Sequence, residues 1–388
     1  MLADTDAGSV ITAAQSGGQW GYRLLLLQLM LIPVLYVVQE LTVRLGLATS
    51  RGHGELIRET FGARWAWLSA ATLVVACVGA LLTQLSGIAG IAQLYGLPAS
   101  PVVAVVVVAI AAMVLTGSYR VVERVAIVFG LFELAFVAVA WRAAPSLHQV
   151  ATEMVDVPLR DTGFLYLAAA NIEAVIMPWM VFYQQSAVVD KGLDVRHLRV
   201  ARIDTAIGAV LTQVIMAAVL VASGAVLRGA SGPHGLSDVP GIAKALIPTL
   251  GLQVGRAAFA AGLAGAAVVA TVVVCLTAAW GVGEVAGYRR SLEHPVREAP
   301  WFYGLFCAML ILGGIVVCSG ANLVRLSLAV QVMNALLLPV VLGFLYLLGR
   351  RALSRPYRLS GIEAALSGLL IVATCAIGVG AAVVGLIN

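Results

Sequence analysis

Long runs of apolar residues, separated by short polar stretches, recur along the whole chain. A helix of about 20 residues, rising about 1.5 Å per residue, crosses the roughly 30 Å hydrocarbon core of a bilayer. Apolar and polar residues do not alternate within the runs, as the strands of a membrane barrel require, so the pattern predicts helices. We predict about ten full spans and one shorter, weaker first segment. They lie near residues 22–47, 66–95, 99–117, 121–141, 163–188, 203–227, 255–286, 301–320, 323–349 and 361–387, with the weaker segment at 1–18.

Composition then narrows the class of protein. The chain has 388 residues, of which 61% are hydrophobic and 11% charged, and its mean hydropathy is +0.99. These values exclude a soluble domain, a disordered chain and a disulfide-rich secreted protein. A nucleic-acid-binding protein is excluded as well, because the basic residues are scattered between apolar blocks. The five cysteines lie inside apolar segments and form no CxxC pair, which favours neither disulfides nor a metal site. We expect an all-α integral membrane protein.

The distribution of positive charge predicts an orientation. If the spans alternate across the membrane, most of the 24 Lys and Arg residues fall on one side. Loops rich in these residues stay in the cytoplasm, so we predict a cytoplasmic N-terminus and a C-terminus outside the cell membrane. The start of the chain has no basic stretch followed by an apolar one, so no cleavable signal peptide is expected. Within the first basic loop, residues 51–64 read as a short amphipathic helix at the lipid surface.

Acidic residues inside the predicted spans are candidates for function, because burying a charge in a membrane costs roughly 2.5–3.5 kcal/mol. Glu40 has a structural explanation, since Arg44 lies four residues further on and can pair with it on one helix face. Glu284 precedes a basic border and is expected at the membrane interface. Glu133 has no partner near it in sequence. The remaining acids are those of the first segment and Glu173 of the sixth span.

Two of the predicted segments contain helix breaks. Asp6-Ala7-Gly8-Ser9 interrupts the first segment and Met177-Pro178 the sixth, with five spans of separation. Pro178 removes a backbone donor, so the sixth helix is expected to break near residues 174–177 and free its carbonyl groups. Breaks at corresponding positions of two halves indicate an inverted-repeat transporter with its site between them. A simple proline kink is the alternative interpretation of the second break.

The two breaks together offer a specific set of ligands. Asp6 and Glu173 supply carboxylates, Ser9 a hydroxyl, the stretch near Ala174 free carbonyls and Met177 a thioether. Such a set is anionic and partly soft, which suits a divalent transition-metal ion better than calcium or magnesium. Methionine is also a common packing residue in apolar helices, so Met177 alone does not decide between a metal ligand and a packing residue.

Three stretches of the chain resemble the Nramp family of divalent-metal transporters, and its Nramp-related outer branch in particular. They are DTDAGSVITAAQSGGQWGYRLL (residues 4–25), Gln39-Glu40-Leu41-Thr42-Val43-Arg44-Leu45-Gly46, and IMPWMVFYQQSAVVDKGL (residues 176–193). The resemblance implies a LeuT-like fold of 5+5 inverted-repeat helices plus one C-terminal helix, here with its first helix shortened at the N-terminus. It also implies one transporter domain over residues 1–388, with a first repeat at about 1–143, a second at about 163–350 and the extra helix at about 361–387.

The resemblance further implies which residues bind the metal. The family's D-P-G-N corresponds to Asp6-Ala7-Gly8-Ser9, and its A-x-x-M-P-H to Ala174-Val175-Ile176-Met177-Pro178-Trp179. Asp6, Ser9, the carbonyl of Ala174 and Met177 would then be ligands. The family's tenth helix carries a glutamine eight residues before a proline, and Gln331 stands eight residues before Pro339, so Gln331 is carried over as a further ligand. Asn334, one turn further on, is our own addition.

The chain also departs from the family. Ser9 replaces the motif asparagine and is a shorter ligand, and Trp179 replaces the motif histidine. In the third helix, Ala80 and Thr83 stand where proton-coupled members carry acids, so the usual proton route is absent. Glu173 occupies a position that is normally glycine. We hypothesise that Glu173 is an extra ligand or a substitute proton carrier, the alternative being an acid that is hydrogen-bonded to a neighbouring helix. All five histidines are expected in loops (His53, His148, His197, His234 and His294).

The sequence therefore predicts a secondary transporter that moves a divalent metal cation by alternating access. Manganese or iron is favoured, and magnesium remains possible. The alternatives are a transporter of the same fold for an amino acid or organic cation, and a degenerate relative that does not transport. An enzyme is not expected, because neither HExxH nor GxSxG is found. We expect no cofactor and no nucleic-acid partner. The expected partners are the divalent metal ion and the lipid bilayer, with a monomer as the functional unit.

Overall fold

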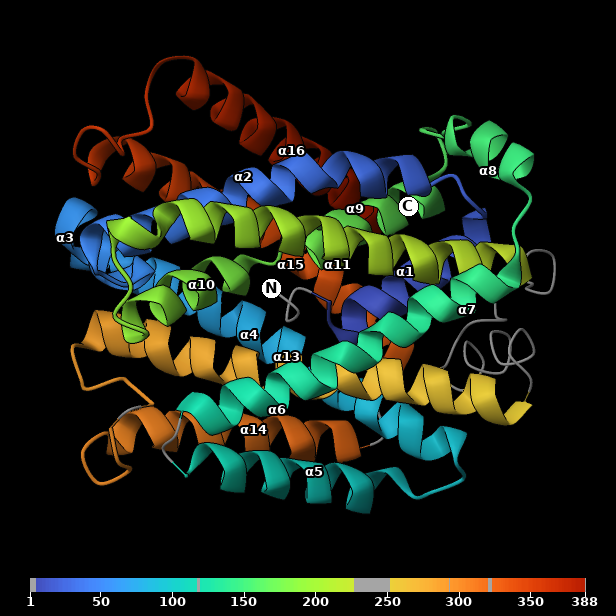
Figure 1. The fold of residues 1–388 in the computed structure, drawn as a ribbon, viewed down its shortest axis with the longest axis horizontal. Coiled ribbons are helices and arrows are strands. Elements are labelled where there is room, and N and C mark those ends of the chain that lie inside the picture. The colour runs from blue at the N-terminus through green and yellow to red at the C-terminus, as the bar shows by residue number, and fades with distance from the viewer. Residues whose placement is uncertain (1–4, 117–118, 227–251, 293, 320–322, 388) are drawn as a thin grey trace.

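The computed structural model describes residues 5–116, 119–226, 252–292, 294–319 and 323–387, and the regular structure in these ranges is helical throughout (Figure 1). Two short 3-10 helices, Phe132–Leu134 and Val195–His197, join or precede longer helices. The α-helices are α1 (Ala7–Trp20), α2 (Leu25–Thr49), α3 (His53–Phe61), α4 (Ala63–Leu94), α5 (Ala99–Val114), α6 (Tyr119–Leu131), α7 (Ala135–Ala143), α8 (Leu147–Met154), α9 (Thr162–Val175), α10 (Pro178–Asp190), α11 (Leu198–Val226), α13 (Leu252–Ala286), α14 (Pro300–Cys318), α15 (Leu323–Arg351) and α16 (Gly361–Ile387).

The predicted membrane fold is confirmed. Within the described ranges, nine helical segments are long and apolar enough to cross a bilayer, and α5 is a shorter apolar helix of 16 residues. The weaker first segment of the prediction corresponds to α1, which has 14 residues. The fourth predicted span corresponds to α6 and α7, which the 3-10 turn at Phe132–Leu134 joins. The division into two repeats and an extra helix stays a prediction.

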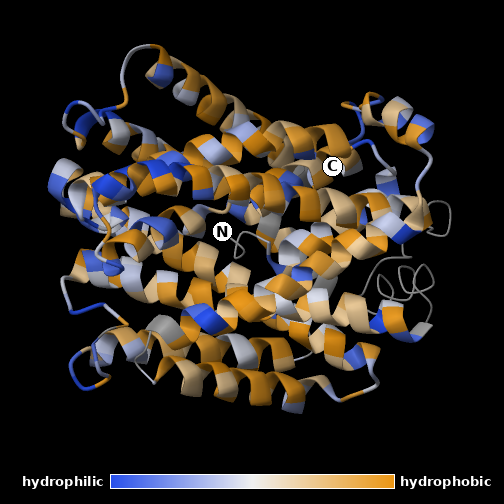
Figure 2. Cartoon of the chain, in the orientation of Figure 1, coloured by the Kyte–Doolittle hydropathy of each residue, from blue (hydrophilic) through white to orange (hydrophobic). Residues whose placement is uncertain are grey.

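The long helices run side by side along the longest axis of the molecule (Figure 1), and polar residues gather where the helices end (Figure 2). One end of the bundle carries α3 and the opposite end carries α8. We refer to these as the α3 end and the α8 end. Their polar character fits a protein that exposes its helix ends to water and its apolar helix flanks to lipid.

Helix α1 lies inside the bundle, in contact with α4, α9, α11, α13 and α15. Its closest approach is to α11. A Cβ added at Gly17 would lie 2.1 Å from the carbonyl oxygen of Leu220, so only glycine allows the two backbones to meet there. Because α1 is enclosed on several sides, the residues at its start are buried although they lie near the beginning of the chain.

An ion-pair network joins α2, α11 and α16 at the α3 end. Arg44 pairs with Glu40 at 2.5 Å, which confirms the predicted pairing, and also with Glu363. Arg202 of α11 reaches the same Glu40 at 2.7 Å. Glu40 and Arg44 are both buried, and burial makes removal of either partner costly, because it leaves a charge unpaired in an apolar environment.

The expectation that all five histidines lie in loops was wrong. His53 is not in a loop: it is the first residue of α3 and is completely buried, with Nδ1 2.9 Å from Oε1 of Gln185. His148 likewise lies in a helix, α8, and His234 lies outside the described residues.

Glu284 was expected at the membrane interface, which stays a prediction, and it has partners inside the protein. Its side chain is buried and accepts hydrogen bonds from Ser186 Oγ at 2.6 Å and from the Gly54 N–H at 2.8 Å. Helix α3 therefore packs into the protein rather than lying at the lipid surface, because its neighbours bury its N-terminal turn.

Candidate metal site

Asp6 caps the buried start of α1. The residue is extended (φ −126°, ψ 171°) and only 3% exposed. Its Oδ1 accepts hydrogen bonds from the N–H and from the Oγ of Ser9, both at 2.6 Å. A carboxylate at this position satisfies backbone donors that have no partner within the helix, and the helix dipole favours its negative charge. The local sequence thus explains why an acid and a serine meet at the start of α1.

The break between α9 and α10 exposes one carbonyl group in particular. Helix α9 ends at Val175, Ile176 and Met177 are non-helical, and Pro178 begins α10. In a continuous helix the carbonyl of Ala174 would accept from the N–H four residues on, but that residue is Pro178, which has none. The carbonyl of Ala174 accepts instead from Ser9 Oγ at 2.9 Å. The predicted break is confirmed, and Pro178 is its physical cause.

Ser9 therefore joins the start of α1 to the α9–α10 break. Its hydroxyl lies 2.6 Å from the carboxylate of Asp6 and 2.9 Å from the carbonyl of Ala174, although the two places are about 165 residues apart in sequence. Met177, the last residue before α10, lies at the same α9–α10 break and is buried. Four of the residues predicted for the site, Asp6, Ser9, Ala174 and Met177, thus lie at these two places.

Glu173 and Asn334 form a second polar pair next to the first. Asn334 Nδ2 of α15 donates to Glu173 Oε1 at 2.9 Å, and both side chains are buried. Within the described ranges, Oε2 of Glu173 and Oδ1 of Asn334 have no hydrogen-bond partner. Glu173 is close enough to Asp6 for the two carboxylates to interact electrostatically. The structure thus brings Asn334 to Glu173 rather than to Asp6. Gln331 lies on α15, but its side chain is outside the described part of the structure.

The sequence interpretation missed Gln84. Its Nε2 donates to Asp6 Oδ2 at 2.6 Å, and its Oε1 accepts from the Ala7 N–H at 2.8 Å. Gln84 is completely buried in α4, next to Thr83, whose hydroxyl bonds the Gly79 carbonyl of its own helix. A glutamine amid the apolar residues of the third span was the available signal. Its partner could not be read from sequence, because the contact joins residues 78 positions apart.

The electrostatics of the site favour a cation. Asp6 and Glu173 are buried acids, and the described ranges contain no salt bridge to either of them. Nor do three His, Cys, Asp or Glu side chains gather anywhere in these ranges. Any ion held here therefore depends on a mixed set of carboxylate, hydroxyl, carbonyl and thioether groups. Negative charge buried in a membrane is costly unless a positive group compensates it, and a bound cation supplies that compensation.

A bundle of membrane helices in which the buried start of one helix meets the break in another at a polar point is typical of transporters with a LeuT-like fold. The sequence model of the family described as "Natural resistance-associated macrophage protein-like" matches residues 1–383. The chain belongs to this family, Nramp, which is a family of transporters and not of enzymes.

Known relatives agree with this assignment. The chain is 28% identical over 376 residues to the divalent metal cation transporter MntH of Burkholderia ambifaria, covering 91% of this chain and 81% of that protein. It is also 28% identical over 402 residues to MntH of Acidiphilium cryptum, covering 96% and 86%.

Solved structures share the fold at lower sequence identity. The manganese transporter of Eremococcus coleocola superposes with a TM-score of 0.78 at 18% identity, covering 100% of this chain and 86% of that one. The structure of MhsT in complex with L-phenylalanine superposes with a TM-score of 0.60 at 15% identity, covering 98% and 97%. Both likenesses are to the arrangement of the helices, and together they confirm the predicted LeuT-like fold.

Proposed function

We propose that the chain is a secondary transporter that moves a divalent metal cation across the cell membrane by alternating access. The ion binds between the start of α1 and the α9–α10 break. The observation that carries the proposal is the Ser9 hydroxyl, which lies between the Asp6 carboxylate and the freed Ala174 carbonyl. These groups come from the start of α1 and from the α9–α10 break, so a cation bound by both would respond to any relative movement of the two.

The donor set favours manganese or iron over magnesium. Asp6, Ser9 and Ala174 offer oxygen ligands, which both kinds of ion accept, whereas the thioether of Met177 is a soft ligand that magnesium does not use. Gln331 is proposed as an additional ligand from α15. The relatives described above as a divalent metal cation transporter and as a manganese transporter support this choice of cargo.

Glu173 is proposed to act beside this site, either as an extra ligand or as a proton carrier. Support comes from its second carboxylate oxygen, which has no hydrogen-bond partner within the described ranges, and from its electrostatic contact with Asp6. Asn334 holds the first oxygen and thereby fixes the orientation of the carboxylate. The same two acids disfavour an amino-acid substrate, because a substrate carboxylate would be repelled by both.

The proposed orientation places the α3 end in the cytoplasm and the α8 end outside. Arg44, Arg51 and Arg290 lie at the α3 end, together with most of the other basic residues, and positive charge favours the cytoplasmic side. All proposed ligands come from one chain, so we propose a monomer as the functional unit.

The test is isothermal titration of Mn²⁺, and then of Mg²⁺, into the purified full chain in detergent. Asp6→Ala and Met177→Ala are compared with Asp156→Ala, which removes an exposed acid, and with Met309→Ala, which truncates a buried methionine of α14. We expect micromolar Mn²⁺ binding that both site variants weaken at least tenfold, about 1.4 kcal/mol, and that both controls leave unchanged. Absence of Mn²⁺ binding by the folded, unaltered chain would overturn the proposal.

A further inference from the structure

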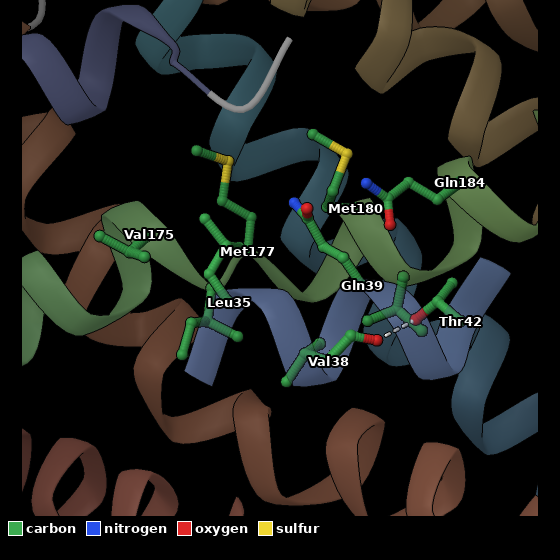
Figure 3. A pocket seen from close by; sticks show the side chains of 10 residues that line it. Leu35, Val38, Gln39, Thr42, Val175, Met177, Met180 and Gln184 are labelled. Carbon is green, nitrogen blue, oxygen red and sulfur yellow. Dashed lines mark hydrogen bonds between the residues drawn. The ribbon is translucent and has the colours of Figure 1, made fainter. Parts of the chain in front are cut away.

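A small cavity lies beside Met177, between α2 and the α9–α10 break (Figure 3). Its volume is about 10 Å³, close to the smallest space that holds one water molecule or one ion. Its lining includes Gln39, Thr42, Met177, Met180 and Gln184. Asp6 and Ser9 are not among its lining residues, whereas Met177, at the α9–α10 break, is.

The polar and sulfur groups of the lining converge. Figure 3 shows the amide groups of Gln39 and Gln184 and the sulfur of Met180 turned toward the same space. Gln39 lies on α2 and the other two on α10, and all three side chains are buried. Amide oxygens and a thioether can coordinate a cation, so a pair of amides and a thioether facing one space forms a candidate cation site.

The cavity also lies in line with a larger one. Gln184 lines both the small cavity and a second cavity of about 410 Å³ at the α3 end. The lining of the larger cavity includes Lys191 and Asp204, and Asp204 is exposed at the surface. Gln184 thus links the small cavity to the larger one at the α3 end, and Met177 of the α9–α10 break lines the small cavity as well.

The chemistry of the lining differs from that of the site at Asp6. Among the residues that the structure describes, the lining of the small cavity offers amide and hydroxyl oxygens and two thioethers but no carboxylate. Neutral ligands bind a divalent cation more weakly than carboxylates do, because no negative charge compensates that of the ion. Weak binding at successive places is what conduction requires, since an ion must be able to leave each one. The thioethers also favour softer cations such as Cd²⁺ over Mg²⁺.

We infer that the cavity lined by Gln39, Met180 and Gln184 is a second, transient cation site on the route between the site at Asp6 and the α3 end. It takes borderline to soft divalent cations, and Met177 is the ligand that both sites share. Met180 thus helps to determine which metals are transported, and it does so through the transfer step rather than through binding at Asp6. The inference rests on the function proposed above.

The experiment compares Met180→Leu with Met309→Leu in the full chain reconstituted into proteoliposomes. Leucine conserves the volume and removes the sulfur, and Met309 is a buried methionine outside both cavities. Uptake of Cd²⁺ and of Mn²⁺ is measured at saturating concentration, and Mn²⁺ affinity by titration calorimetry. For Met180→Leu we expect unchanged Mn²⁺ affinity, a Cd²⁺ uptake rate about tenfold lower and a smaller loss for Mn²⁺, whereas Met309→Leu behaves as the unaltered chain.

Met180→Cys keeps a sulfur at the same place and is expected to retain the preference for Cd²⁺ over Mn²⁺. A Met180→Leu variant that binds Mn²⁺ normally and transports both cations at unaltered rates would overturn the second site and leave the proposed function standing. Failure of the unaltered chain to bind any of the metals would overturn the proposed function, and the second site with it.

Discussion

Gln84 of α4 gives Asp6 a hydrogen-bond donor from outside α1. One amide group pairs with both the Asp6 carboxylate and the Ala7 N–H, so it satisfies an acceptor and a donor at the buried start of α1. A residue in this position fixes the carboxylate without itself being a ligand, as residues behind metal ligands commonly do. Its effect on metal binding should therefore be indirect.

Replacing Gln84 tests this role. In Gln84→Leu, the Ala7 N–H and Asp6 Oδ2 both lose a partner in a buried environment, which costs roughly 1–3 kcal/mol for each group. We expect a lower unfolding temperature in detergent and a Mn²⁺ affinity that is about 10-fold to 100-fold weaker by titration calorimetry. The matched control is Thr83→Val, because the hydroxyl of Thr83 bonds only its own helix among the contacts described. Equal Mn²⁺ affinity in the two variants would contradict the role given to Gln84.

Single residues show where sequence interpretation succeeds and where it stops. Asp6, Ser9 and Ala174 could be predicted because each lies in a local motif, and the structure brings their groups together. Gln84 could not, because its contact depends on how α4 packs against the start of α1. Asn334 was predicted to lie near the site, and its amide donates a hydrogen bond to Glu173. The spacing along α15 could not show whether Asn334 would contact Asp6 or Glu173, because the two acids lie on other helices.

At the scale of elements, the α9–α10 break follows from one missing backbone N–H, that of Pro178. Pro178→Ala supplies an N–H four residues after Ala174, so the helix can close over that carbonyl. We expect Mn²⁺ affinity to fall about tenfold in a titration, because the carbonyl then has an intrahelical partner and Ser9 loses an acceptor.

Pro33→Ala is the control for this substitution, since Pro33 also lies inside a membrane helix, α2, but is exposed. A proline-to-alanine change by itself should leave Mn²⁺ binding intact there. If Pro178→Ala binds Mn²⁺ as tightly as Pro33→Ala does, the freed carbonyl is not needed for the ion.

The sequence predicted the long membrane spans better than the placement of the short helices. The long spans followed directly from apolar length, because lipid requires about 20 apolar residues whatever the neighbouring helices are. Helix α3 was predicted as a helix but placed at the lipid surface, whereas its residues His53, Leu56 and Ile57 are buried against the bundle. A short amphipathic helix has an apolar face in either case, and sequence does not say whether lipid or protein covers it.

For the whole molecule, the buried His53 makes stability depend on pH. His53 lies in α3, outside the membrane spans, and burial lowers the pKa of its imidazole to about 4 from an ordinary value near 6.5. The unfolded chain therefore binds a proton below pH 6.5 that the folded chain does not bind. The stability contributed by neutral His53 is complete above pH 6.5 and is lost as the pH falls from 6.5 toward 4.

We expect the unfolding temperature in detergent to fall between pH 7.5 and pH 5, with a contribution from His53 of about 2 kcal/mol. His53→Gln keeps a donor for Gln185 Oε1 and cannot titrate, so its unfolding temperature should change less over this range. His148→Gln, which replaces an exposed histidine, should follow the unaltered chain. Identical pH profiles for all three proteins would show that His53 does not control this stability.

The contact between Gly17 and Leu220 limits how the whole bundle can move. Two backbones that meet with no side chain between them cannot slide or tilt independently without opening a gap that nothing nearby can fill. We therefore expect helices α1 and α11 to move as one rigid body. If α1 carries Asp6 away from Ala174, α11 should move with it, so labels placed on α11, far from the ion, should report the opening of the site.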